Sequence, residues 1–195
     1  MKSIRPLSLA AAAAFCLTLA GCGSVPPAPV DRFYRLQPAA PATTGKVLPG
    51  AVAVLPFTAD SLFAERPLVY GEETNPRQLR QYHYHLWLYA PPQAVREHLL
   101  ASLGNALEFT GTEPAPYTLE GRVVRFERIV GAQGGKAAAS LQLRLHAGGK
   151  VVLDRTYQAE QPAAGDSMSA FVAAMEQALA KIYADFLKDA AGRRG

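Results

Sequence analysis

The hydrophobic positions in the last part of the chain recur with the spacing of an amphipathic helix. Positions three and four apart share one helix face, so these residues predict a single buried stripe. Asp166 or Ser167 provides an N-cap, and Gly192 follows the last hydrophobic position. The stripe consists of Met168, Phe171, Val172, Met175, Leu179, Ile182, Tyr183 and Phe186.

A second helix is predicted after Pro91-Pro92, because proline suits the first turn of a helix. Its hydrophobic residues follow at i+4 spacing, Leu100 and Ala106 widen the stripe, and the helix is expected to end near Leu107, before Gly111. The stripe consists of Val95, Leu99, Leu103 and Leu107.

Between these helices the pattern changes to the alternation of strands. The glycine-rich segments 131–135 and 147–150 are turns, so residues 117–159 predict an antiparallel meander with one wet face. In its second strand Ala139, Leu141, Leu143 and Leu145 alternate with Ser140, Gln142, Arg144 and His146. In its third strand the shared face is expected to hold Val151, Leu153 and Tyr157.

The first strand of this meander breaks the alternation. Leu119 and Val123 share one face, whereas Val124, Phe126 and Val130 fall on the other. A single extra residue near 123–124, a β-bulge, would bring both sets to the core.

The N-terminal half has three shorter strand-like segments. They are residues 33–36, residues 51–57, which read as buried on both faces and end at Pro56, and residues 82–89. Residues 61–80 read as irregular, with a short strand at 68–70. Strict alternation in 82–89 would place Tyr82, Tyr84, Leu86 and Leu88 opposite His83, His85, Trp87 and Tyr89.

Together these elements predict one domain with one core. The expected fold class is α+β, a two-layer sandwich in which a mainly antiparallel sheet is covered by two amphipathic helices.

The first 22 residues carry a different signal. Lys2 and Arg5 precede an uncharged stretch of 14 residues, 7–20, which fits the apolar region of a signal peptide and is shorter than the about 20 residues that span a bilayer. Leu19-Ala20-Gly21-Cys22 resembles the bacterial lipobox, in which the cysteine thiol takes a diacylglyceryl group. A core helix that ends by chance at a cysteine is the alternative. We expect residues 1–21 to be removed and Cys22 to be the lipid-attachment site, carrying palmitate-like chains.

Removal of this leader changes the composition of the working protein. The formal net charge falls from +4 to +2 with the loss of Lys2 and Arg5, and no run of basic residues indicates nucleic-acid binding. Cys16 is lost and Cys22 is acylated, which leaves no thiol for a disulfide or a cysteine metal site.

Residues 22–31 form a Pro-rich tether behind the lipid. The 11 residues from Cys22 to Phe33 reach at most about 36–40 Å, so the domain works close to its membrane. Gly23, rather than an aspartate, follows the cysteine, which favours the outer membrane under enterobacterial sorting.

The side chains that could take part in catalysis or metal binding do not form a recognisable active site. His83 and His85 could form a metal pair, but no third ligand lies near them in sequence, and histidines on a partly exposed strand are the favoured interpretation. Residues 131–135 lack the Gly-Lys-Ser/Thr of a phosphate loop, and no Gly-x-Ser-x-Gly elbow occurs. We therefore expect no catalytic, cofactor-binding or metal site and no enzymatic activity.

Four arginines could form a basic strip across two strands: Arg122, Arg125, Arg128 and Arg144. A solvated face balanced by Glu120 and Glu127 is the favoured interpretation.

Several motifs in order resemble the ABC-type transport auxiliary lipoprotein family. They are residues 33–36, 52–57, 68–71, 82–87 leading into Pro91-Pro92, 117–121, 124–127 and the terminal helix. The resemblance implies that residues 32–191 are the auxiliary domain.

The resemblance also implies a function: a periplasm-facing, outer-membrane-anchored docking subunit of an ABC transport system with a mammalian-cell-entry (MCE) protein, moving lipids or hydrophobic molecules between the two membranes. Its partners would be the MCE-domain protein, the permease and ATPase, and further copies of itself in a ring. The alternatives are an assembly lipoprotein for lipopolysaccharide or outer-membrane proteins, and a lipid-modifying enzyme, which would need a deep polar pocket. Residues 82–89 and the loop before them are the candidate partner surface, because they hold more aromatic surface than a small core needs.

Overall fold

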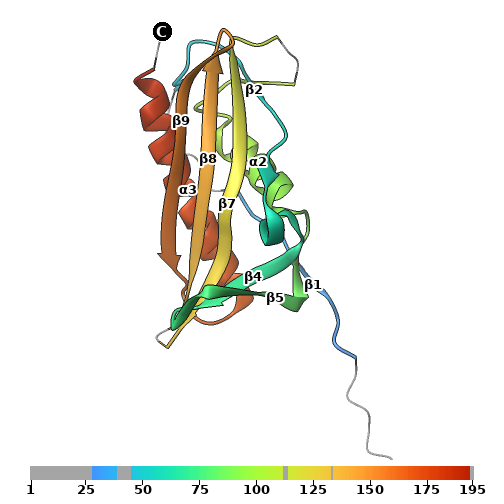
Figure 1. Ribbon diagram of the computed structural model, residues 1–195. Helices are drawn as coiled ribbons and strands as arrows, with labels where there is room; N and C mark the ends of the chain where they lie inside the picture. Colours follow the sequence, from blue (N-terminus) through green and yellow to red (C-terminus); the bar gives the residue numbers. More distant parts are fainter. Residues whose placement is uncertain (1–27, 39–44, 112–113, 133, 194–195) are drawn as a thin grey trace, which may run out of the picture. The chain divides into compact units, whose positions relative to one another are not determined.

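The computed structural model describes residues 28–38, 45–111, 114–132 and 134–193. Residues 31–195 form one compact unit. Its largest feature is an antiparallel meander of three long strands, β7 (Tyr117–Gly131), β8 (Gly134–Ala147) and β9 (Lys150–Pro162), seen in yellow to brown in Figure 1. The predicted meander is therefore confirmed.

The turn between β8 and β9 shows why the sequence has two glycines there. Gly148 and Gly149 lie between the paired residues Ala147 and Lys150, and both have positive φ, +53° and +79°. Two consecutive residues with positive φ form the turn that suits the twist of a two-residue hairpin. On β8, alternation is confirmed for the buried Ala139, Leu141, Leu143 and Leu145, whereas Ser140 is buried too.

The predicted β-bulge in β7 is confirmed. Val123 pairs with Leu141 and Arg125 with Ser140, which leaves Val124 as the extra residue. The bulge brings Phe126 into the core beside Val123, and Val124 itself is 43% exposed. The expectation that Val124 also joins the core is therefore wrong.

A second bulge lies at the start of β9, and no feature of the local pattern predicted it. Leu145 pairs with Leu153 but His146 pairs with Val151, so Val152 is the extra residue. The bulge turns Val151 away from Leu153 and leaves it 53% exposed, which corrects the predicted shared face.

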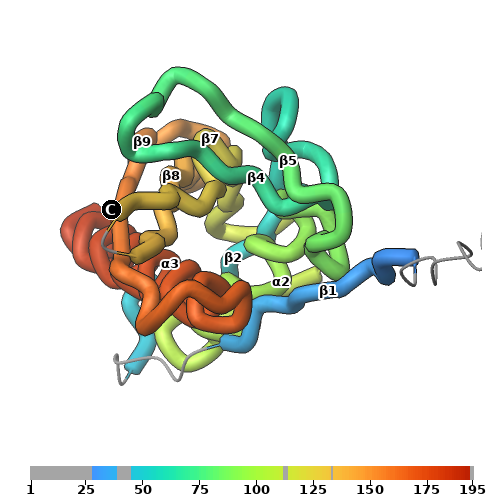
Figure 2. The backbone as a smooth tube through the Cα atoms, turned by 90° about the horizontal axis from the view of Figure 1, so that it is seen from below, coloured from blue at the N-terminus to red at the C-terminus, as the bar shows by residue number. Residues whose placement is uncertain are grey.

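Both predicted helices pack against the core. The long helix α3 (Met168–Ala191) crosses β8 and β9, and α2 (Pro91–Leu103) contacts β7 and α3. Figure 2 shows the two helices beside the meander. Ser167, not Asp166, is the N-cap of α3, because its Oγ accepts the backbone N–H of Ala170 at 3.1 Å.

Helix α2 ends one turn earlier than predicted. Gly104 is its C-cap, and the backbone N–H groups of Ala106 and Leu107 donate to the Leu103 carbonyl in a terminal turn. Ala106 and Leu107 are buried all the same, so the hydrophobic stripe continues past the helix.

The rest of the sheet is built on the other edge of β7 by short strands in parallel. These are β2 (Val52–Val54), β3 (Thr58–Ala59) and β4 (Pro67–Glu72), with β6 (Phe109–Thr110) beside β2. The parallel pairs were not foreseen, but the long strands are antiparallel and the sheet is not closed, so the predicted α+β class is confirmed.

The short strand predicted at 68–70 is confirmed, because it lies within β4, but the interpretation of the rest of residues 61–80 as irregular is wrong. They contain a 3₁₀ turn, η1 (Ser61–Ala64), strand β4 and the first half of β5 (Asn75–Trp87). The first four residues of β5 are all exposed, so neither helical nor strand periodicity appears in the sequence. The predicted strand at the start of the domain is β1 (Arg32–Tyr34), which lies parallel to the end of β5.

Strict alternation also fails within the aromatic part of β5. Pro67 pairs with Leu86 and Val69 with Gln81, so the residues between them bulge out of the ladder. The rings of Tyr82 and His85 meet at 5.5 Å, although alternation would put them on opposite faces. Trp87 is buried at 1% exposure and packs on Phe126 and Phe171.

Candidate functional site

Cys22, the predicted lipid-attachment residue, lies outside the described residues, as do the predicted leader and most of the tether. Within the described parts of the chain, none of the helices has the length and apolar character needed to cross a membrane.

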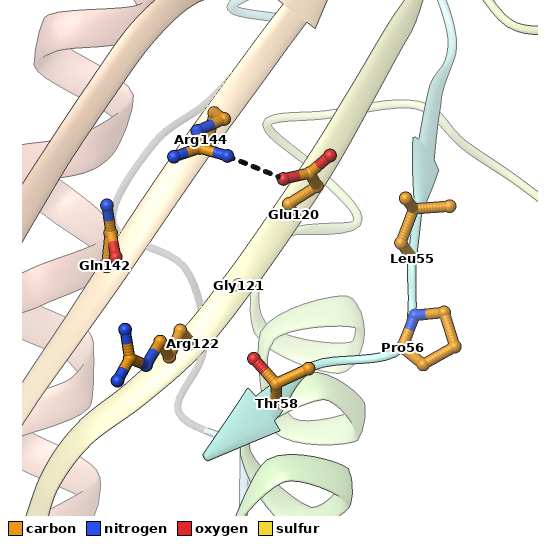
Figure 3. A pocket seen from close by; sticks show the side chains of 8 residues that line it. All are labelled: Leu55, Pro56, Thr58, Glu120, Gly121, Arg122, Gln142 and Arg144. Carbon is orange, nitrogen blue, oxygen red and sulfur yellow. Dashed lines mark hydrogen bonds and ion pairs between the residues drawn. The ribbon is translucent and has the colours of Figure 1, made fainter. Parts of the chain in front are cut away.

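A pocket of about 340 Å³ lies on the polar face of the meander, where β2 and β3 run beside β7. Figure 3 shows its residues: Leu55, Pro56, Thr58, Glu120, Gly121, Arg122, Gln142 and Arg144. This is the face that the sequence predicted to be wet.

The charged groups around this pocket are engaged with one another. Arg144 bridges Glu120 at 3.3 Å and Asp154 at 2.9 Å, and Arg122 pairs with Asp60. Hydrogen bonds from Gln142 and then from Arg144 lower the pKa of Asp154, which keeps this carboxylate ionised. The arrangement stabilises local charge and resembles a solvated sheet face.

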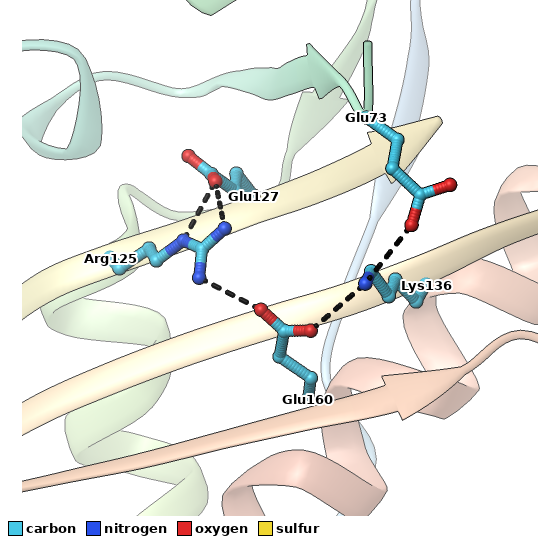
Figure 4. Close-up of polar contacts among 5 residues, drawn as sticks. All are labelled: Glu73, Arg125, Glu127, Lys136 and Glu160. Carbon is cyan, nitrogen blue, oxygen red and sulfur yellow. Dashed lines mark hydrogen bonds and ion pairs between the residues drawn. The ribbon is translucent and has the colours of Figure 1, made fainter. Parts of the chain in front are cut away.

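A second polar network lies along the same strands nearer the other end of the meander (Figure 4). Arg125 holds the buried Glu127 through Nε and Nη2, both at 2.7 Å, and reaches Glu160 through Nη1 at 3.0 Å. Lys136 links Glu160 at 3.1 Å to Glu73 at 3.4 Å. Burial alone would raise the pKa of Glu160, but hydrogen bonds from Lys136 and Arg125 outweigh it and lower the pKa. The interpretation of balanced charge thus fits Arg122, Arg125 and Arg144.

Arg128 does not belong to that face. Its side chain is 9% exposed, and it donates from Nη2 to the Asp166 carbonyl at 2.9 Å and from Nη1 to the Tyr82 hydroxyl at 3.3 Å. It therefore ties β5 and β7 to the start of α3, and the four arginines do not form one strip.

The two histidines considered as a metal pair, His83 and His85, lie in different environments. His83 is exposed, whereas the Nδ1 of His85 bonds the Tyr34 hydroxyl at 2.8 Å. Burial, with Arg32 and Arg128 nearby, lowers the pKa of His85. No cluster of three or more His, Cys, Asp or Glu side chains suited to a metal occurs in the described parts of the chain.

A more apolar groove of about 380 Å³ lies where β1, the end of β5 and α2 meet. It is lined by Tyr34, Arg35, Leu36, Pro38, Leu88, Tyr89, Ala94, Glu97, His98 and Ala101. The sequence pointed to residues 82–89 as a candidate surface, but it did not reveal that residues 34–38 would form the opposite wall. The one signal in the sequence that Leu88 and Tyr89 lie beside α2 was their position just before Pro91-Pro92.

The wall formed by residues 34–38 is held from both helices through the backbone of Gln37. On α2 the buried His98 makes this contact: its Nε2 lies 3.1 Å from the Gln37 carbonyl, and its Nδ1 lies 3.1 Å from the Tyr183 hydroxyl. The Gln37 N–H donates to Glu176 Oε1 on α3 at 2.6 Å. Burial lowers the pKa of His98, so the neutral imidazole with a proton on Nε2 fits both contacts.

Comparison with solved structures shows where this fold has been seen before. A crystal structure of a DUF330-family protein from Xanthomonas campestris matches with a TM-score of 0.69 at 19% identity, over 83% of this chain and 96% of that one. A second crystal structure, of an uncharacterised protein, matches with a TM-score of 0.66 at 18% identity, over 82% and 97%. At this identity the likeness shows the fold.

The family is shown by the sequence comparison. No curated protein matches the chain. The model of the family described as ABC-type transport auxiliary lipoprotein component matches residues 34–186, from the end of β1 to the last part of α3. The chain belongs to the family of ABC-type transport auxiliary lipoprotein components.

Proposed function

We propose that this chain is a non-enzymatic docking subunit of an MCE-type ABC transport system, anchored at the outer membrane by a lipid on Cys22 and facing the periplasm. The family match over residues 34–186 carries the proposal, because it names an ABC-transport auxiliary role. The lipobox before Cys22 supports the anchor, and the short tether calls for a partner that spans the periplasm.

The geometry of the described domain fits docking better than chemistry. Its polar pocket is lined by charges that pair with one another, and the groove beside β1 holds a histidine already engaged on both nitrogens. The transported molecule would be a lipid or another hydrophobic compound, passed on by the MCE-domain protein and its permease and ATPase.

Affinity purification of the full lipidated chain, extracted in detergent from its own organism, tests the proposal. We expect the MCE-domain protein to be recovered with it after cross-linking. The matched control is the same tagged chain from a strain that lacks the MCE gene, in which the permease and ATPase should also be lost from the eluate.

Two results would contradict the proposal. An eluate without the MCE protein, together with no envelope phenotype on deletion, would remove it. Cross-links to an outer-membrane β-barrel protein instead would favour the alternative, an assembly lipoprotein for lipopolysaccharide or outer-membrane proteins.

A further inference from the structure

Apart from Val30 before β1 and Tyr84 on β5, the exposed large hydrophobic side chains of the described residues fall into two kinds. Val124 and Val151 are exposed because the β-bulges turn them outward on the meander. Phe33 at 53%, Leu88 at 39% and Tyr89 at 50% exposure lie instead on β1 and on the connection from β5 to α2. No bulge accounts for this second group.

Two members of the second group, Leu88 and Tyr89, lie at one place in the fold, whereas Phe33 faces Arg66 and does not line the groove. Leu88 and Tyr89 line the groove of about 380 Å³ together with Tyr34 and Leu36. The backbone N–H of Leu88 donates to the Tyr34 carbonyl at 2.6 Å, which joins the two walls directly. Because both the N–H and the carbonyl of Gln37 are hydrogen-bonded to the helices, this wall of the groove has a fixed position.

The chain that leads to the predicted lipid enters at this same surface. Asp31 precedes β1, and Tyr34 is only three positions further along the chain, a distance of at most about 11 Å. Asp31 is nine positions after Cys22, a stretch that reaches at most about 32 Å. A lipid on Cys22 would therefore keep the groove within a few tens of ångströms of the bilayer and at high effective concentration against it.

The residue types around the groove match the headgroup region of a bilayer. Tyrosine is enriched there because its ring is apolar and its hydroxyl is polar. Three cations lie on β1 or beside it: Arg32 and Arg35 are exposed, and the guanidinium of Arg66 stacks 5.1 Å from the Phe33 ring. Three acidic residues, Asp31, Glu97 and Glu176, are also close by, so the formal charges of the surface balance.

We propose that the surface formed by Tyr34, Leu36, Leu88 and Tyr89 rests on the lipid bilayer that holds the anchor, with Leu88 and Tyr89 at the boundary of headgroups and acyl chains. This contact fixes the orientation of the domain relative to the membrane. The inference rests on the proposed lipidation of Cys22.

Site-directed spin labelling of the full lipidated chain tests this seating. The mature chain has no free thiol when Cys22 is acylated, so a label on Leu88→Cys is the only one. The matched control is Val151→Cys, an exposed hydrophobic position on β9. Both are reconstituted in vesicles of phosphatidylethanolamine with a minor fraction of phosphatidylglycerol. Power saturation then measures access to oxygen, which concentrates in lipid, and to a nickel chelate, which stays in water.

We expect the ratio of oxygen access to nickel access to be several-fold higher at position 88 than at position 151. Equal, water-like ratios at the two positions would overturn the proposal. So would a label at position 88 that is shielded from both reagents, because a second copy or another protein would then occupy the groove. Flotation of the vesicles reports the anchor separately: a chain that does not float contradicts both anchor and seating, whereas a floating chain with a water-exposed label contradicts the seating alone.

Discussion

Gly121 occupies a position on β7 where only hydrogen fits. A Cβ at this residue would lie 2.4–2.5 Å from three carbon atoms of the Phe57 ring, well inside contact distance. The ring is buried at 7% exposure between the segment after β2 and the sheet, so it has little room to move. We expect Gly121→Ala to lower the free energy of unfolding by about 1–3 kcal/mol through overpacking, as measured by urea denaturation.

Two comparisons make this prediction specific. Gly111→Ala is the matched control, because no atom of the described residues lies within 4 Å of a Cβ there, and it should change the unfolding free energy little. In a Phe57→Leu background the cost of Gly121→Ala should shrink, since the smaller side chain leaves space. Equal costs in both backgrounds would show that Phe57 is not the cause.

His98 makes the stability of the domain depend on pH. Its pKa is lowered from the ordinary 6.5, chiefly by burial, so the unfolded chain binds more protons than the folded chain below that value. The free energy of unfolding is therefore expected to fall as the pH drops from 6.5 through the folded pKa of His98. Above pH 6.5 the neutral His98 makes its full contribution. His85, with a pKa lowered mainly by burial, adds a change of the same sign.

The variant His98→Gln isolates this contribution. The amide cannot titrate but can still donate to the Gln37 carbonyl. We expect its melting temperature to depend less on pH than that of the wild type between about pH 5 and pH 8. Parallel curves for the two proteins in thermal unfolding would contradict the assignment to His98.

Helix α3 depends on its first turn for part of its stability. Ser167 Oγ accepts the N–H of Ala170, which would otherwise lack a partner within the helix. We expect Ser167→Ala to cost about 1 kcal/mol of unfolding free energy, measured by chemical denaturation. Ser169→Ala, at an exposed position two residues on, is the control and should be neutral or slightly stabilising. A similar loss in both variants would argue against the cap.

The elements that the sequence predicted well are those in which polar residues mark the phase of the pattern. On β8, Gln142 and Arg144 stand between buried leucines, and on β7 the shift of phase after Val123 shows the bulge directly. At the start of β9, Val151, Val152 and Leu153 are all hydrophobic, so no polar residue marks the bulge there. In the aromatic part of β5, His83 and His85 alternate with Tyr82 and Tyr84, so the pattern looks regular and hides the bulge.

Pairing between distant strands could not be predicted from local pattern. The parallel pairs of β2, β3 and β4 with β7, and of β1 with β5, depend on where the connections bring each short strand. The first half of β5 is largely exposed, so its hydrophobic residues show no alternation, and the sequence predicts no strand there.

The candidate surfaces were predicted only in part. The sequence pointed to the aromatic residues before Pro91-Pro92, and Leu88 and Tyr89 do line the groove. The other wall of the groove, and His98 as the residue that holds it, needed the structure, because a contact between Gln37 and α2 spans 61 positions. Cys22 was assigned from its motif alone and stays a prediction.

For the whole molecule, the hydrophobic core and the predicted anchor are separate parts of the chain. Every residue of the described core cluster lies between Val47 and Ala190, and the partly buried residues packed against it begin at Tyr34. The charge networks on the meander likewise join strands of the same domain. The domain is therefore expected to fold without its lipid, as a domain with its own core does.

That separation gives a test of Cys22 itself. We expect a variant with Cys22→Ala, and with residues 1–21 replaced by an ordinary cleavable signal peptide, to be exported, to keep the melting temperature of the wild type and to leave the membrane fraction on washing. Its loss from membranes follows because each buried CH₂ of the lipid contributes about 0.8 kcal/mol, so two or three chains outweigh a contact made by a few side chains. Fractionation after a salt wash measures the change, and mass spectrometry of the wild-type N-terminal peptide gives the matched control by weighing the attached lipid. A variant that stays on washed membranes, or a wild-type peptide of unmodified mass, would show that Cys22 is not the anchor.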